Sequence, residues 1–172
     1  HNRTKEFLTE LNHKYRNDKH VIKLLHGICL GDFWFYHSHP ESERALSIII
    51  DIFEMLLASV KDEANLELLA TTLMQFMDRL STQDGFSKSI ITRCFSIIEA
   101  DIPRHEAIYI RNSGYFKACF DKLAQHKEFF PVIMRLTSHI LERCFDYWEE
   151  TSAAEDWFRS KRHLFTTMND EQ

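Results

Sequence analysis

The sequence predicts an all-α protein, and three observations support that prediction. Apolar residues recur at intervals of three and four along almost every segment, which is the period of a helix buried along one stripe. Only four Gly and three Pro occur in 172 residues, whereas sheet-rich folds of this size use more turn residues. No segment shows strict apolar and polar alternation between turn signals. We expect eight or nine antiparallel helices, stacked as a short α-solenoid or packed as an irregular helical bundle.

Two helices are expected in the first 31 residues. The first begins near Thr4, which can cap it, and the second follows Asn17 and Asp18, which break the apolar pattern. Gly27 and Gly31 weaken the end of the second helix, so a kink or turn is expected there. The expected inward-facing residues are Phe7, Leu8 and Leu11 in the first helix and Val21, Leu24, Leu25 and Ile28 in the second.

The next two helices have clear start signals. Pro40 can open the third helix, because a missing N–H costs nothing at the first helical position, and this helix should continue to about Val60. Asp62 can cap the fourth helix, which the turn at 81–85 terminates. The apolar stripe of the third helix comprises Leu46, Ile49, Ile50, Phe53, Leu56, Leu57 and Val60.

The second half of the chain predicts five further helices. A helix over 86–100 should end before Pro103, and Gly114 can close the short helix that follows by adopting the left-handed conformation. Pro131 can open a long helix. The expected ranges are 86–100, 104–112, 115–125, 131–150 and 152–168, and residues 168–172 should form a loose tail.

Length and composition predict one domain over residues 1–172. The chain starts at His1 without an initiator Met, so we expect a fragment of a larger protein. No apolar run reaches the roughly 18 to 20 residues that span a bilayer. The four Cys lie in apolar helical patterns without a CxxC pair, which favours reduced thiols in the cytoplasm or nucleus. A net charge of −5 argues against binding of nucleic acid.

One stretch has the spacing of a zinc site. In "FYHSHP", His37 and His39 precede Pro40, and Ser47 comes after six intervening residues. This pattern resembles the JAMM-type (MPN+) metalloproteases, in which His-x-His-Pro is followed, after six intervening residues, by Ser-x-x-Asp. The resemblance implies an isopeptidase of ubiquitin-like modifiers whose zinc is held by the two histidines and an aspartate.

The third zinc ligand is misplaced in this sequence. Ile50 occupies the aspartate position, and Asp51 comes one residue later. One residue on a helix is about 100° of rotation, so Asp51 should face solvent, opposite the apolar stripe. We therefore reject a metal site at His37, His39 and Asp51. No phosphate-binding glycine motif or other ligand spacing occurs, so we expect no cofactor and no enzyme activity.

The remaining prediction is protein–protein interaction. The stretch "EAIYIRNSGYFKACFDKLAQ", 106–125, resembles the helix, glycine turn and longer third helix of an armadillo repeat. The resemblance implies an armadillo- or HEAT-like scaffold that binds a peptide or helix of another protein. The helix at 115–125 should bury Phe116, Cys119, Phe120 and Leu123 and present Tyr115, Lys122 and Gln125, with Arg111 in the turn, to the partner. The alternative is a helical regulatory or oligomerisation bundle, with Trp34, Tyr36 and Trp148 in a subunit contact.

Overall fold

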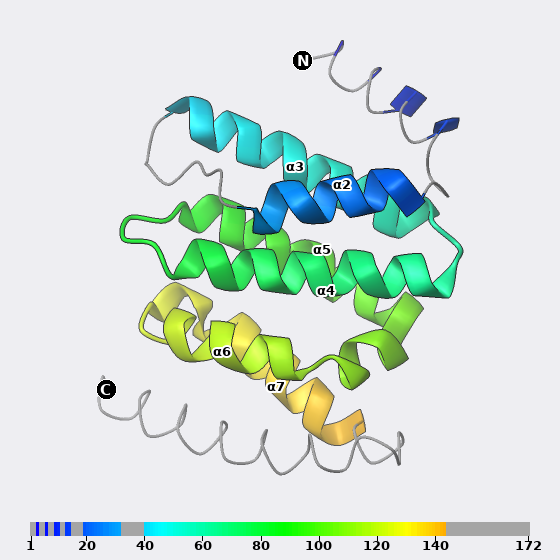
Figure 1. Cartoon of the computed structure of the whole chain (residues 1–172). Helices are drawn as coiled ribbons and strands as arrows, with labels where there is room; N and C mark the ends of the chain where they lie inside the picture. Colours follow the sequence, from blue (N-terminus) through cyan, green and yellow to red (C-terminus); the bar gives the residue numbers. More distant parts are fainter. Residues whose placement is uncertain are drawn as a thin grey trace.

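A computed structural model gives the structure of the protein (Figure 1). It describes residues 19–31 and 40–143, together with the single positions 3, 6, 9, 10, 13 and 14. The described residues form α-helices and one short 3-10 helix and contain no β-strand, which confirms the all-α prediction for this part of the chain. The elements are α2 (Lys19–Leu30), α3 (Pro40–Ser59), α4 (Glu63–Ser81), α5 (Lys88–Arg111), α6 (Gly114–Leu123), η1 (Lys127–Phe129) and α7 (Phe130–Arg143).

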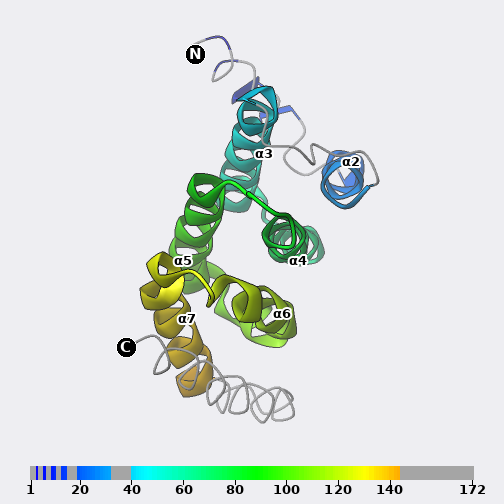
Figure 2. The same cartoon turned by 90° about the vertical axis from the view of Figure 1, so that its left-hand side faces the viewer.

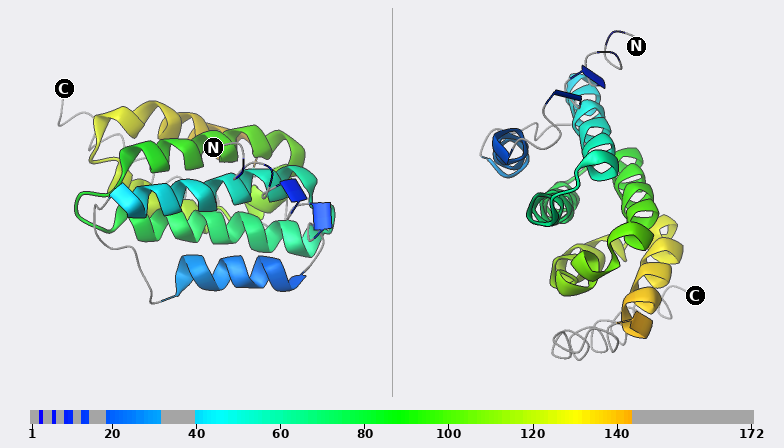
Figure 3. Two further views of the ribbon diagram at one scale, coloured as in Figure 1. Left: turned by 90° about the horizontal axis from the view of Figure 1, so that it is seen from above. Right: turned by 90° about the vertical axis from the view of Figure 1, so that its right-hand side faces the viewer.

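The helices lie in two rows, which Figure 2 and the right-hand view of Figure 3 show side by side. Helices α3, α5 and α7 form one row, and α2, α4 and α6 form the other. Neighbours within each row contact one another, and α4 also packs against α3 and α5. The apolar core therefore lies between the rows, and successive helices alternate between them.

Hydrogen bonds between the α3–α4 pair and the α5–α6 pair join residues 40 to 46 positions apart, whereas those between α5 and α7 join residues 33 to 37 positions apart. The hydrogen bonds that link α3 to the start of α5, and α4 to the end of α5 and to α6, repeatedly join residues 44 positions apart. The α3–α4 pair thus lies against the α5–α6 pair nearly in register. The pairs at this separation are Glu43 with Ser87, Glu67 with Arg111 and Asp78 with Lys122.

The predicted starts of three helices are confirmed. Helix α3 begins at Pro40, and all seven residues of its predicted apolar stripe are buried. Asp62 caps α4, because its Oδ2 accepts a hydrogen bond from the backbone N–H of Asn65 at 2.9 Å. Pro131 lies in the first turn of α7. The loop after α4 turns at Gly85, whose φ of 70° suits a residue without a side chain.

The prediction that a helix ends before Pro103 is wrong. Helix α5 runs through Pro103 and departs from helical geometry only at His105, with φ −139° and ψ 42°. Proline removes one backbone donor but already has a helical φ, so the helix continues through Pro103 and bends two residues later. The two helices predicted at 86–100 and 104–112 thus correspond to the two segments of α5 on either side of the kink, and only the predicted position of the break is wrong.

Two smaller predictions are also wrong. Gly114 does not adopt the left-handed conformation and instead begins α6, because Asn112 and Ser113 complete the turn with helical hydrogen bonds. Helix α2 buries a stripe that is rotated from the predicted one, and Leu24 is 64% exposed and Ile28 39% exposed. Leu25 belongs to both the predicted and the observed stripe. The buried residues of α2 are Ile22, Leu25 and Cys29.

Candidate functional site

The helix predicted to carry recognition residues is oriented as expected. The four side chains predicted to face the core from α6 are all buried: Phe116, Cys119, Phe120 and Leu123. On the opposite face Tyr115 is 40% exposed, and Gln125, just after the helix, is also exposed. Two of the four predicted partner-binding residues on and around α6 are therefore exposed to solvent.

Arg111 binds α4 rather than pointing freely into solvent. Its Nε and Nη2 donate to the two carboxylate oxygens of Glu67 at 3.0 and 3.1 Å, and Asn112 donates to the same carboxylate at 2.9 Å. The hydrogen bond from Arg111, followed by that from Asn112, holds the pKa of Glu67 below its ordinary value. This forked pair fastens the end of α5 to the first turns of α4.

Lys122 makes the equivalent connection at the other end of α4. Its Nζ donates to Oδ1 of Asp78 at 2.7 Å and to Oγ1 of Thr82 at 2.6 Å. Arg111 and Lys122 are only partly exposed, so both hold α4 against the helices that follow it. A partner that used either residue would have to share it with an existing ion pair.

Several predicted residues lie outside the described part of the chain. They are Trp34, Tyr36 and Trp148 of the predicted subunit contact and His37 and His39 of the rejected zinc motif. The predictions for these five residues therefore remain predictions.

Asp51, the displaced carboxylate of the zinc motif, pairs with α5. Its Oδ1 accepts a hydrogen bond from Nη2 of Arg93, whose Nη1 also donates to Oγ of Ser47 at 3.0 Å. Asp51 is thus half-exposed rather than fully solvent-facing, because α5 packs beside α3. Ile50, at the position where the motif requires aspartate, is completely buried. Within the described ranges, no three His, Cys, Asp or Glu side chains come together as metal ligands.

The three described cysteines are buried free thiols on different helices. Burial raises the pKa of Cys29 and of Cys119 to about 12, and it also raises the pKa of Cys94. Because the thiolate is the reactive form, these cysteines are poor nucleophiles at neutral pH. This result agrees with the sequence interpretation for Cys29, Cys94 and Cys119.

The kink of α5 contains a buried polar cluster that the sequence analysis missed. The side chain of Asp101 is 1% exposed, and its carboxylate accepts hydrogen bonds from Tyr109 Oη at 2.6 Å and from His105 Nδ1 at 3.0 Å. Arg104 Nη2 lies 3.2 Å from the same carboxylate. Burial, and then the charge of Asp101, raise the pKa of Tyr109. The spacing 101, 105 and 109 places these side chains on one helical face, a signal present in the sequence.

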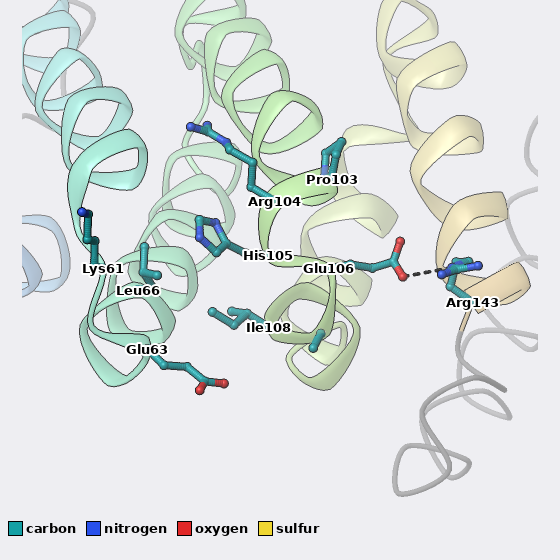
Figure 4. Close-up of a pocket in the computed structure, with 10 residues that line it drawn as sticks. Lys61, Glu63, Leu66, Pro103, Arg104, His105, Glu106, Ile108 and Arg143 are labelled. Carbon is teal, nitrogen blue, oxygen red and sulfur yellow. Dashed lines mark hydrogen bonds and ion pairs between the residues drawn. The ribbon is translucent and has the colours of Figure 1, made fainter.

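His105 and its neighbour Glu106 point to different partners, as expected for adjacent helical residues. Glu106 accepts hydrogen bonds from His139 Nε2 at 3.0 Å and Arg143 Nε at 2.9 Å on α7. His105 instead lines a pocket of about 620 Å³ at the kink (Figure 4). The arrangement offers a histidine fixed by a buried carboxylate at the wall of an open pocket.

Comparisons with known proteins give no identification. No protein-family model, curated protein or solved structure matches this chain. In the part of the chain that the structure describes, no helix is both long and apolar enough to cross a membrane.

Proposed function

We propose that this chain is a non-enzymatic scaffold of stacked helix pairs, with armadillo or HEAT character, that binds a peptide or helix of another protein. The observation that carries the proposal is the spacing of the hydrogen bonds between the α3–α4 pair and the α5–α6 pair, which join residues 40 to 46 positions apart. HEAT and armadillo repeats have lengths of about 40 to 47 residues. In such stacks each pair buries its apolar face against the next, as the α3–α4 and α5–α6 pairs do here.

The proposed binding face is the outer side of the row formed by α2, α4 and α6. Tyr115 and Gln125 are exposed on this side, and tyrosine is among the residues that dominate protein interfaces. Arg111 and Lys122 contribute indirectly, because their ion pairs hold α4 against the end of α5 and against α6, respectively. The buried thiols of Cys29, Cys94 and Cys119 favour a reducing compartment, so we place the protein in the cytoplasm or nucleus.

Selection of binding peptides from a displayed library, followed by affinity measurement, tests this proposal. We expect Tyr115→Ala to weaken the selected peptides about tenfold or more, as loss of an interface anchor does. Ile48→Ala is the matched control, because Ile48 is 37% exposed and lies on α3 in the opposite row. It should leave the affinity unchanged.

Two outcomes would contradict the proposal. Failure to select any peptide would argue against a peptide-binding scaffold. An equal loss of affinity in Ile48→Ala and Tyr115→Ala would argue against the α2, α4 and α6 face as the binding surface. Circular dichroism of both variants separates loss of binding from loss of the fold.

A further inference from the structure

The pocket at the kink of α5 has the size of a small-molecule site. Its volume of about 620 Å³ lies between the α3–α4 connection, the kinked part of α5 and the end of α7. Pockets of about 300 to 1,000 Å³ are typical of ligand sites. Leu66 and Ile108 are buried and give the pocket apolar walls, while Lys61, Arg104 and His105 give it polar groups (Figure 4).

The buried carboxylate of Asp101 determines which nitrogen of His105 faces the pocket as an acceptor. Three donors surround this carboxylate, from Tyr109, His105 and Arg104, and an ionised carboxylate only accepts hydrogen bonds. Nδ1 of His105 therefore carries a proton, and Nε2 of the neutral ring is a basic acceptor. Nε2 has no hydrogen-bond partner among the described residues.

Two cationic side chains share the pocket with His105. Arg104 is about half exposed and uses Nη2 toward Asp101, which leaves other N–H groups of its guanidinium able to donate. Lys61 is exposed and forms no ion pair with the described residues. Against the single charge of Asp101, these two side chains leave a local excess of positive charge, which rises when His105 is protonated.

The acidic residues of the lining do not cancel this excess. Glu106 already accepts hydrogen bonds from His139 and Arg143 at the α7 side of the pocket. Glu63 is mostly exposed, its carboxylate lies 3.7 Å from Arg111, and it points away from His105 (Figure 4). The side of the pocket formed by Lys61, Arg104 and His105 is therefore suited to an anion.

We propose that this pocket binds a phosphate monoester. Near neutral pH such a group exchanges between monoanion and dianion, because its second pKa is about 6. When the ligand is a monoanion, its P–O–H donates a hydrogen bond to the neutral Nε2 of His105. When the ligand is a dianion, its oxygen accepts a hydrogen bond from the protonated Nε2. In both cases one proton lies between the ligand oxygen and Nε2. Lys61 and Arg104 donate to the remaining oxygens, and the rest of the pocket accommodates the esterified group.

Titration of the whole chain with inorganic phosphate, followed by NMR of the His105 ring nitrogens, tests the proposal. The signals are assigned by comparison with His105→Gln. We expect a saturable shift of Nε2, and we expect Lys61→Gln and Arg104→Gln each to weaken binding about tenfold through loss of a charge-assisted hydrogen bond. Lys88→Gln is the charge-matched control, because Lys88 pairs with Glu128 at the other end of α5. It should leave the affinity unchanged.

Sulfate and a phosphoserine peptide extend the test. Sulfate cannot donate a proton to neutral Nε2, so it should bind more weakly than phosphate at neutral pH. Tighter binding of a short phosphoserine peptide than of glycerol phosphate would identify a phosphorylated residue as the source of the ligand, and the reverse order a free phosphate ester. Both orders support the site.

Absence of a saturable His105 shift would overturn the proposal, as would an equal loss of affinity in Lys88→Gln and Lys61→Gln. Lys61 is exposed and makes no ion pair with the described residues, so Lys61→Gln keeps the test valid even if Arg104→Gln alters the kink. Circular dichroism checks the helix content of each variant. The result is independent of peptide binding to the opposite row.

Discussion

Helices α4 and α5 follow one another and share the same apolar period, yet α4 is continuous and α5 bends at His105. Helix α4 buries Thr72, whose hydroxyl donates to the carbonyl of Leu68 one turn earlier at 2.6 Å. Helix α5 buries Asp101, whose carboxylate can only accept. The helix backbone satisfies a buried hydroxyl, but its N–H groups are already used, so a buried carboxylate needs side-chain donors. The bend of α5 therefore coincides with a buried carboxylate as well as with Pro103, and the variants below separate the two causes.

Of the changes that test this difference between α4 and α5, removal of the Asp101 carboxylate should cause the largest loss of stability. We expect Asp101→Ala to lower the free energy of unfolding by about 3 kcal/mol or more, because it leaves the hydroxyl of Tyr109 buried without an acceptor. Thr72→Val, the matched change in α4, should cost no more than about 1 kcal/mol, since the Leu68 carbonyl keeps its backbone partner. Urea denaturation monitored by circular dichroism measures both values. Similar losses in the two variants would mean that the carboxylate has no special role.

The second test separates Asp101 from Pro103 as the cause of the kink. We expect Pro103→Ala to leave the kink in place and to change stability by no more than about 1 kcal/mol, because the contacts of Asp101 across the bend remain. The ¹³Cα chemical shift of His105 reports its backbone conformation. A helical shift for His105 in Pro103→Ala would assign the kink to proline instead.

The smallest expected effect concerns the ion pair between Glu67 of α4 and Arg111 of α5. The folded-state pKa of Glu67 lies below its unfolded value, so the pair stabilises the protein above the unfolded pKa, and this contribution is lost as the pH falls through the folded pKa. We expect the stability of Glu67→Gln to fall less steeply than that of the wild type between about pH 5 and pH 3. The effect is small because Glu67 and Arg111 are each about one-third exposed or more. Glu54→Gln, an exposed change on α3, is the control and should keep the wild-type slope.

Helices α3 and α2 show where the apolar period of the sequence predicts the buried face of a helix correctly and where it does not. All seven predicted core residues of α3 are buried, because this helix is long and its stripe contains only large apolar side chains. In α2 apolar residues lie on more than one side, so the period alone did not determine which side faces α4. Leu24 and Ile28 were assigned to the wrong face for this reason.

The candidate sites were less predictable than the fold. Arg111 and Lys122 look like solvated side chains in the sequence, and only the packing of α5 and α6 beside α4 shows that they bind Glu67 and Asp78. The pocket beside His105 depends on the kink and on the end of α7, which lies 38 residues later at Arg143. Local spacing could indicate that Asp101 and His105 share a face, but not that a pocket lies beside them.

The sequence by itself determined the all-helical class, the starts of α3, α4 and α7 and the inner face of α6. These features depend on capping residues, proline positions and apolar period, all of which act within a few residues of one another. The tertiary structure alone decided the two rows, the buried face of α2 and the partners of the charged side chains on other helices. Those features depend on which helices meet across long sequence separations, where packing and the pairing of buried charges outweigh local preference.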